Sequence, residues 1–285
     1  MTEKPLVSVV IATYKRSGLV PRAIESVRKQ TYRNVEILVV DDGSPDNTRA
    51  VVESIPDDRI RYIRHEKNKG LPAARNTGIR AAQGEYIAFL DDDDEWREDK
   101  LEKQLQAVEN YDAVVCGALI SGRMRVLHNR PNVTLDDLRN YIPDPSGLLV
   151  KANVIKDLLF DESLKLGEDW DVFIRIAQRH TIGFIEESLV MYNDGGHPRM
   201  TNEAKDQTDT ELEKNTAVLL KHRKLFGEKW FKYHLARVLT SHIHRRRNKL
   251  RCILYALRRC GIGAVAAVMA DKISRQVRTL TPHRG

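Results

Sequence analysis

The sequence has 285 residues, 41% of them hydrophobic and 31% charged, which is typical of a soluble globular protein long enough to bury a core. Its three cysteines, Cys116, Cys252 and Cys260, are odd in number and have no CxxC spacing, which argues against a zinc site or a disulfide framework and favours a reducing compartment. No basic segment followed by an apolar one opens the sequence, so we expect no signal peptide and a cytoplasmic protein.

The net charge of +7 is distributed unevenly along the chain. Residues 1–204 contain 28 Lys and Arg against 34 Asp and Glu, whereas residues 205–285 contain 19 against 6, a net charge of +13. We therefore predict an acidic domain over residues 1–203 and a basic extension over residues 204–285.

The first hundred residues alternate between apolar runs typical of buried strands and segments with helical periodicity. The predicted strands are Leu6–Ala12, Val35–Val40, Ile60–Arg64 and Tyr86–Leu90, and the predicted helices are Leu19–Gln30, Thr48–Ile55 and Leu71–Ala82. Such alternation predicts an α/β fold with a mostly parallel sheet and helices on both faces.

Further regular elements follow the first hundred residues. We predict helices at Asp99–Asn110, Val154–Leu159 and Leu166–Arg179, and strands at Ala113–Leu119, Ser146–Val150 and Ile182–Met191. The stretch from Ser121 to Asp144 has no regular pattern.

An uninterrupted run of five acids follows the predicted strand Tyr86–Leu90: Asp91, Asp92, Asp93, Asp94 and Glu95. Like charges ~4 Å apart repel by ~1 kcal/mol each even in water, and more when half-buried. A divalent metal would relieve this repulsion, because hard cations bind carboxylate oxygens. On an extended segment Asp91 and Asp93 point to one side and Asp92 and Asp94 to the other, so one such pair can share a metal.

An alternative explanation is that these acids stabilise the positive end of the helix that follows. It accounts for Asp94, Glu95, Glu98 and Asp99, which we assign to the start of that helix. It does not account for Asp91–Asp93, which directly follow the apolar run.

A second acidic pair, Asp41 and Asp42, follows the predicted strand Val35–Val40. Ligands of parallel α/β sheets bind at the carboxyl ends of the strands. We therefore expect this pair and Asp91–Asp93 to share one cleft.

From about Glu203 the pattern is entirely helical, with predicted helices at Leu212–Phe226, Trp230–His244, Lys249–Arg258 and Ile262–Val277. The longest uncharged run there, Cys260–Ala270, has 11 residues, and a membrane span needs ~20. The basic residues near Arg245–Arg251 suit either an anionic membrane surface over residues 245–278 or the solvated face of a helical bundle. Nucleic acid is disfavoured as a partner, because no aromatic stacking pattern accompanies the charges.

Four segments in order resemble family-two nucleotide-sugar glycosyltransferases of the GT-A fold. They read VSVVIATYKR, EILVVDDGSPDNT, NKGLPAARNTGIRAAQGEYIAFLDDDDEW and GEDWD, and the resemblance covers roughly residues 5–200. It implies a Rossmann-like sheet, a nucleotide-diphospho-sugar donor (a UDP-sugar first), and a glycan or lipid-linked acceptor. It also implies Mn²⁺ or Mg²⁺, which suit carboxylate and phosphate oxygens.

The resemblance also implies roles for residues on the donor side. Ala12, Thr13 and Tyr14 would border the nucleotide base, with Ala12 standing where the family usually has proline. Asp42 matches the acid that contacts the base, whereas Asp41 would only support the turn. Arg75 and Asn76 match the segment that lines the diphosphate and sugar, although Arg75 can equally be a charge on the helix surface.

The remaining implied roles concern the metal and the reaction. Asp91 and Asp93 match the DxD acids, with Asp92 near the ribose and Asp93 the main metal ligand, and His197 matches a C-terminal metal-contacting histidine. Asp169 matches the catalytic base of an inverting transfer, with Glu168 and Trp170 on the acceptor side. A base at a helix N-terminus needs burial to raise its pKa, which Trp170 would supply.

Two other functions compete with this interpretation. A nucleotidyltransferase also uses metal-binding acids, but it needs a Gly-rich basic loop that Thr13–Gly18 matches poorly. A non-catalytic nucleotide-sugar-binding module would not need a base such as Asp169 opposite the metal. The loops that would determine sugar, acceptor and linkage are Ser121–Asp144 and Gly195–Glu203.

Overall fold

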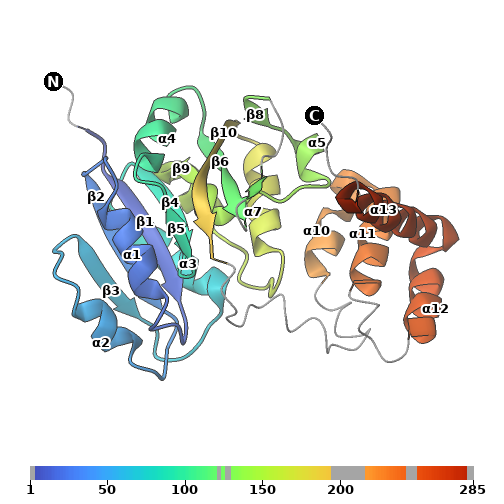
Figure 1. The fold of residues 1–285 in the computed structure, drawn as a ribbon, viewed down its shortest axis with the longest axis horizontal. Helices are drawn as coiled ribbons and strands as arrows, with labels where there is room; N and C mark the ends of the chain where they lie inside the picture. The colour runs from blue at the N-terminus through green and yellow to red at the C-terminus, as the bar shows by residue number, and fades with distance from the viewer. Residues whose placement is uncertain (1–3, 121–122, 126–129, 194–215, 242–248, 281–285) are drawn as a thin grey trace. The chain divides into compact units, whose positions relative to one another are not determined.

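The computed structural model describes residues 4–120, 123–125, 130–193, 216–241 and 249–280. The chain divides into two compact units, 1–195 and 196–285. All the described strands belong to the first unit, and the described part of the second is helical (Figure 1). The predicted domain boundary at residues 203/204 lies outside the described residues.

The first unit is organised around one mixed sheet, with the strand order β3-β2-β1-β4-β9-β6-β10-β5, and with β7 beside β6 and β8 beside β10. The strands are β1 (Val7–Thr13), β2 (Val35–Asp41), β3 (Ile60–Arg64), β4 (Tyr86–Asp91), β5 (Asp94–Trp96), β6 (Ala113–Ile120), β7 (Arg123–Arg125), β8 (Asn132–Val133), β9 (Leu149–Lys151) and β10 (Ile182–Tyr192).

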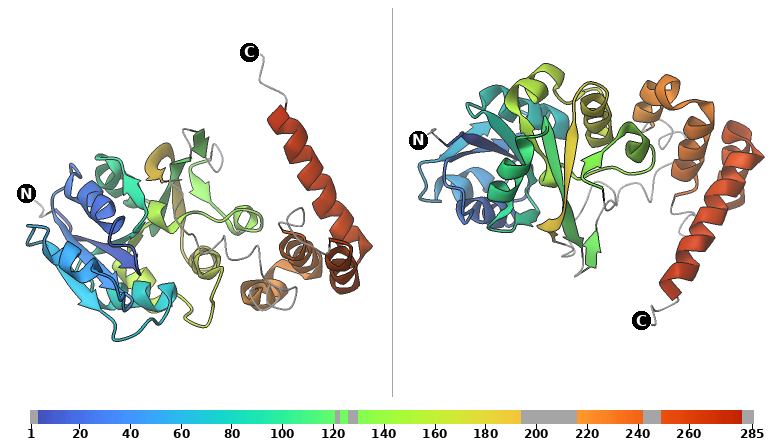
Figure 2. Two further views of the ribbon diagram at one scale, coloured as in Figure 1. Left: turned by 60° about the horizontal axis from the view of Figure 1, so that its bottom comes forward. Right: turned by 90° about the horizontal axis from the view of Figure 1, so that it is seen from above.

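Helices lie on both faces of this sheet, as Figures 1 and 2 show. They are α1 (Val20–Arg28), α2 (Thr48–Glu53), α3 (Leu71–Ala81), α4 (Lys100–Val108), α5 (Leu135–Leu138), α6 (Ala152–Leu158) and α7 (Glu168–Ala177), with one 3₁₀ turn, η1 (Pro145–Gly147). Apolar residues of α1, α2 and α4 share the main core with the sheet, whereas α3 and α6 pack on the opposite face. The predicted parallel α/β architecture is therefore confirmed for β1 to β4.

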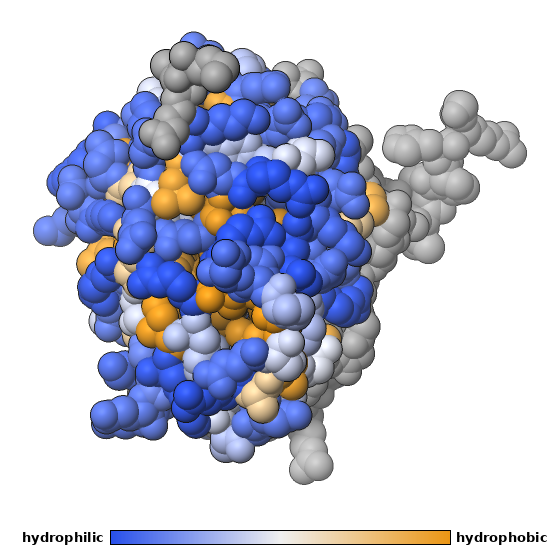
Figure 3. Space-filling view, turned by 90° about the vertical axis from the view of Figure 1, so that its left-hand side faces the viewer, coloured by the Kyte–Doolittle hydropathy of each residue, from blue (hydrophilic) through white to orange (hydrophobic). Residues whose placement is uncertain are grey.

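Burial explains the composition of these strands. Every residue of β1 and β2 is buried, which agrees with their mostly apolar sequences, because strands covered on both faces need apolar side chains on both sides. The edge strand β3 is only partly buried and carries Arg61 and Arg64. Seen from the side of β2 and β3, the first unit presents a mostly hydrophilic surface (Figure 3).

Helix α3 approaches β1 unusually closely at Gly78. A β-carbon at this position would lie 2.4 Å from Cγ1 of Val10, inside contact distance. Only glycine allows this approach, and it fixes the height of α3, and thus of Arg75, above the sheet.

The acids after β4 do not extend the strand or begin the next helix. Asp92 and Asp93 form a turn, and Asp94–Trp96 return as β5, which pairs antiparallel with β10. Helix α4 begins only at Lys100, so the assignment of Asp94 and Glu95 to its first turn was wrong. The short strand is held by Trp96, which is buried and donates from Nε1 to the carbonyl of Ser146 (2.8 Å).

The predicted strand Ser146–Val150 also has a different form. Its first half is η1, and its second half, β9, runs antiparallel between β4 and β6. The reversal places η1 at the carboxyl end of β4, where the backbone N–H of Asp91 donates to Oγ of Ser146 (3.1 Å).

The second unit contains α10 (Ala217–Phe226), α11 (Glu228–Leu239), α12 (Lys249–Cys260) and α13 (Ile262–Leu280), close to the four predicted helices. Its interior includes the ring of Trp230, whose centroid lies 4.7 Å from that of Phe226 and 4.8 Å from that of His234. Among the described helices, none combines the length and hydropathy needed to cross a bilayer.

Candidate active site

The carboxyl ends of three parallel strands meet at one edge of the sheet. Thr13 of β1 pairs with Asp41 of β2, and Ala12 pairs with Asp91 of β4. The register therefore brings the two acidic segments to the same edge, as expected. Ala12 and Thr13 are buried there, whereas Tyr14 is 37% exposed.

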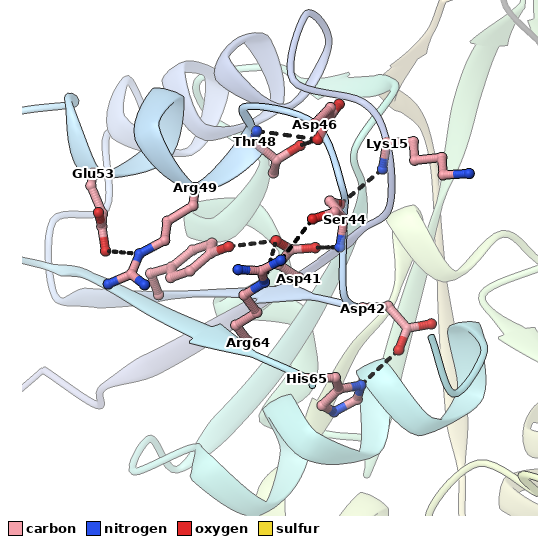
Figure 4. Close-up of polar contacts among 11 residues, drawn as sticks. Lys15, Asp41, Asp42, Ser44, Asp46, Thr48, Arg49, Glu53, Arg64 and His65 are labelled. Carbon is pink, nitrogen blue, oxygen red and sulfur yellow. Dashed lines mark hydrogen bonds and ion pairs between the residues drawn. The ribbon is translucent and has the colours of Figure 1, made fainter. Parts of the chain in front are cut away.

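Asp41 supports the turn that follows β2. Its carboxylate accepts hydrogen bonds from the backbone N–H of Ser44 (2.8 Å) and from the hydroxyl of Tyr62. Oγ of Ser44 in turn accepts from the backbone N–H of Lys15 (2.9 Å), in the turn after β1 (Figure 4). The two loops are thereby joined, and the supporting role predicted for Asp41 is confirmed.

Asp42 is buried but keeps capacity for a further hydrogen bond. Its Oδ1 contacts Nδ1 of His65 (2.7 Å) and accepts from the N–H of Lys69 (2.8 Å), while Oδ2 accepts from the N–H of Gly70 (2.7 Å). Figure 4 shows the carboxylate directed at the imidazole. Because a carboxylate oxygen accepts about two bonds, Oδ2 can accept one more donor. That a nucleotide base supplies this further donor stays a prediction.

The run of acids forms a compact group of oxygens. Asp91, Asp93 and Asp94 each offer a carboxylate oxygen within 4.8 Å of the others. Oδ1 of Asp94 is buried and has no hydrogen-bond partner among the described residues. Burial, followed by the charges of Asp144, Asp91 and Asp93, raises the pKa of Asp94 to about 9. Such a set of hard oxygen donors fits Mg²⁺ or Mn²⁺.

The predicted alternation along this run is only partly correct, because the turn interrupts the extended backbone. Asp94 joins Asp91 and Asp93 instead of pointing away with Asp92. Asp92 accepts from Nη1 of Arg16 (2.7 Å), which also lies 2.9 Å from Oδ2 of Asp93. Burial raises the pKa of Asp92 to about 6, although Arg16 opposes the shift.

Arg75 connects the acidic group to α7. Its guanidinium is buried and donates to Oδ1 of Asp91 (2.7 Å) and Oε1 of Glu168 (3.1 Å), over the ring of Phe160. Burial alone would lower the pKa of Arg75, but the charges of Asp91 and Glu168 raise it above its ordinary value. The alternative of a surface charge was wrong: Arg75 lies inside the site.

Asn76 has a different environment from its neighbour. Its amide donates to the carbonyl of Phe160 (2.9 Å) and to Glu162 (2.8 Å), and its oxygen accepts from the N–H of Phe160 (2.7 Å). Because these hydrogen bonds engage the side-chain amide, Asn76 holds the loop before α7 in place and does not line the acidic group.

Glu168 and Asp169 begin α7, after Gly167 in the left-handed region (φ 82°). Burial raises the pKa of Glu168 to about 7 and that of Asp169 above its ordinary value. Asp169 accepts from the N–H of Trp170 (2.7 Å), and the buried Trp170 donates from Nε1 to the carbonyl of Leu138 (2.6 Å). The expected upward shift of the pKa, against the helix dipole, is therefore found.

Asp144, before η1, is an acid that sequence reasoning did not identify. Its Oδ1 accepts from the N–H of Ser146 (2.7 Å). Burial, followed by the charge of Asp91, raises its pKa to about 7. His65 and Arg16 were also missed, and no local pattern distinguishes them. His197 and residues 195–203 lie outside the described residues.

Residues 8–161 match the family model for glycosyl transferase family 2. Among curated proteins, the chain is 36% identical over 204 residues to a glycosyltransferase of Rickettsia felis, covering 64% of this chain and 32% of that protein. It thus spans about a third of that relative's length. It is 34% identical over 196 residues to the succinoglycan biosynthesis protein ExoO of Rhizobium meliloti (58% and 54%).

A shorter match carries a more specific name. Over 100 residues, 35% of this chain and 40% of the other, the identity to the Escherichia coli protein WfgD is 47%. That protein is named UDP-Glc:alpha-D-GlcNAc-diphosphoundecaprenol beta-1,3-glucosyltransferase.

Two solved structures share the fold. TarS 1-349 of S. aureus in complex with UDP-GlcNAc superposes with a TM-score of 0.64 at 19% identity, over 95% of this chain and 91% of the other. The mannosyltransferase PcManGT of Pyrobaculum calidifontis, in complex with GDP-Man and Mn²⁺, gives 0.63 at 18% identity, over 97% and 81%. At these identities the likeness concerns the fold.

Proposed function

The chain belongs to glycosyltransferase family 2, with the GT-A fold, and from this premise we propose that it transfers a sugar from a nucleotide-diphospho-sugar to a glycan or lipid-linked acceptor. The observation that carries the proposal is the position of Arg75. This buried guanidinium contacts Asp91, which belongs to the carboxylate group that fits a metal ion. It also contacts Glu168, the neighbour in sequence of Asp169, the candidate base. A diphosphate site and a proton acceptor would thus lie within one site.

We propose an inverting displacement at this site. The acceptor hydroxyl attacks the anomeric carbon, the bond to the diphosphate oxygen breaks, and Asp169 takes the hydroxyl proton. Burial raises the pKa of Asp169 and so makes it a stronger base than a solvated aspartate. A divalent cation bound by Asp91, Asp93 and Asp94 would stabilise the charge of the departing nucleoside diphosphate.

A UDP-sugar is the first donor to test. The free position on Oδ2 of Asp42 suits one N–H of a base, and the exposed ring of Tyr14 suits stacking. The names of WfgD and the TarS complex contain UDP-sugars, whereas PcManGT is in complex with GDP-Man, so guanine remains the main alternative.

The second unit supports a proposal about the acceptor. Helix α12 buries Cys252, Ala256 and Cys260, while Leu250 and Leu254 are 67% and 57% exposed. Arg251, Arg258 and Arg259 are also exposed on this helix. Exposed leucines among arginines are typical of a helix that binds an anionic membrane surface, where a lipid-linked acceptor would be met. Retention of the protein in washed membranes at low salt would support this proposal, and complete release would contradict it.

The experiment for the reaction is hydrolysis and transfer across a panel of UDP-, GDP- and dTDP-sugars, with Mn²⁺ or with EDTA. We expect release of one nucleoside diphosphate only with the metal, and its loss in Asp93→Ala and Asp169→Asn. Asp58→Asn, at an exposed position in the first unit, is the control and should keep full activity. If wild-type protein neither turns over nor shows metal-dependent binding of any of these nucleotide sugars, the proposed function is wrong.

A further inference from the structure

Ser146 lies at the centre of the η1 turn and is fully buried. Its backbone and side-chain polar groups contact β4, β5 and Asp144. Its N–H donates to Oδ1 of Asp144 (2.7 Å), and its carbonyl accepts from Nε1 of Trp96 (2.8 Å).

The hydroxyl of Ser146 makes the most informative contacts. It accepts from the backbone N–H of Asp91 (3.1 Å), and it donates to Oδ2 of Asp94 (2.9 Å). A serine hydroxyl has one proton to donate, and here Asp94 receives it. The hydrogen bond holds Oδ2, and it leaves Oδ1 of Asp94, which is buried and without a partner among the described residues, as the oxygen available to a ligand.

We infer that Ser146 is a positioning residue for the divalent cation: its hydroxyl fixes the spacing of Asp91 and Asp94 and presents Oδ1 of Asp94 to the ion. This inference rests on the proposed function. Strands β4 and β5 run in opposite directions on either side of the turn Asp92–Asp93. Ser146 contacts Asp91, the last residue of β4, and Asp94, the first residue of β5. Residues that orient ligands in this way raise metal affinity, typically by 10- to 100-fold.

The chain contains a closely matched control at the opposite end of the sheet. Ser8 of β1 is also fully buried, donates from Oγ to a carboxylate oxygen of Glu36 (2.6 Å), and accepts from the backbone N–H of Gly84 (2.8 Å). Ser8→Ala therefore removes the same kinds of hydrogen bond as Ser146→Ala, without touching the acidic group.

The test measures Mn²⁺ binding to the full chain from the loss of the free-Mn²⁺ electron paramagnetic resonance signal, with thermal melts in parallel. We expect Ser146→Ala to weaken Mn²⁺ binding about tenfold or more. Ser8→Ala should bind Mn²⁺ within about twofold of wild type, although its melting temperature falls by a similar amount. Ser146→Cys keeps the side-chain size but donates weakly, so it should also weaken binding, and it decides the matter if the alanine variant does not fold.

Two results would overturn the inference alone: unchanged Mn²⁺ binding in the folded Ser146 variants, or equal weakening in Ser8→Ala. A different result would contradict the proposed cation site itself. If wild type binds no Mn²⁺, or if Asp93→Ala binds it as well as wild type does, then the acids are not the site and the inference fails with it.

Discussion

Arg75 is the residue whose removal should have the largest effect on the site. A buried guanidinium between two carboxylates leaves both without a counter-charge when it is removed, which typically costs about 3–5 kcal/mol. We therefore expect Arg75→Ala to lower the free energy of unfolding by several kcal/mol and to abolish transfer, as measured by urea denaturation and by assay.

Arg80 provides the control for this prediction on the same helix. It is exposed and lies 3.5 Å from Glu162, and exposed pairs contribute about 0–1 kcal/mol. Arg80→Ala should therefore be nearly neutral. A second arm, Arg75→Ala with Glu168→Gln, should recover part of the lost stability, and no recovery would mean that the pair with Glu168 is not energetically important.

At the scale of single elements, the proposed membrane binding would depend on α12. Replacing Leu250 and Leu254 with glutamate adds two negative charges where two apolar side chains are exposed. We expect the double variant to bind vesicles containing phosphatidylglycerol at least tenfold more weakly in sedimentation.

Leu220, on α10, is the matched control because it is also exposed (56%) and has lysine beside it. Leu220→Glu should leave vesicle sedimentation unchanged if α12 is the contact. Equal loss in both variants would indicate a general charge effect and would contradict a role specific to α12.

Four carboxyls in and around the candidate site, which come from several elements, should make the stability of the protein depend on pH. Burial raises the pKa of Asp92 to about 6, those of Glu168 and Asp144 to about 7, and that of Asp94 to about 9. A carboxyl with a raised pKa contributes stability that is fully present below its unfolded pKa of about 4. This contribution falls continuously as the pH rises and is lost once the pH passes the raised value.

Without metal, these four carboxyls should therefore lower the melting temperature from about pH 4, where unfolded carboxyls ionise, up to about pH 9. Mn²⁺ competes with protons for the same oxygens, so the rise in melting temperature that it causes should grow over this range. Differential scanning fluorimetry with Mn²⁺ and with EDTA at several pH values would measure both effects. A metal effect of the same size at every pH would mean that the ion binds elsewhere.

For the whole molecule, local patterns in the sequence predicted the parallel half of the sheet well. The runs Val7–Thr13, Val35–Asp41 and Tyr86–Asp91 are mostly apolar, and helices lie between them in the sequence. Since this alternation leaves few topologies, the position of Asp41, Asp42 and Asp91 at one edge followed from it.

The parts that the sequence did not predict depend on contacts between distant segments. Asp94 joins the acidic group only because Trp96 and Ser146 hold β5 in an antiparallel return. Asp144 caps η1, the turn that leads into β9, and β9 runs antiparallel to its neighbours; hydropathy carries no information on strand direction. Arg75 is buried on α3, and the polar residues in the sequence of this helix did not indicate which of them would be buried.

The close contact between Gly78 and Val10 has a consequence for engineering the enzyme. A methyl group at this position would act as a spacer between two layers and would lift Arg75 from both carboxylates without altering any charge. The geometry of the candidate site thus depends on a spacing between helix and sheet that is set at Gly78 and Val10, outside the acidic residues themselves. Mutant libraries aimed at a new donor should therefore vary the loops and leave Gly78 and Val10 untouched, since a change at this contact would resemble loss of the active site in any screen.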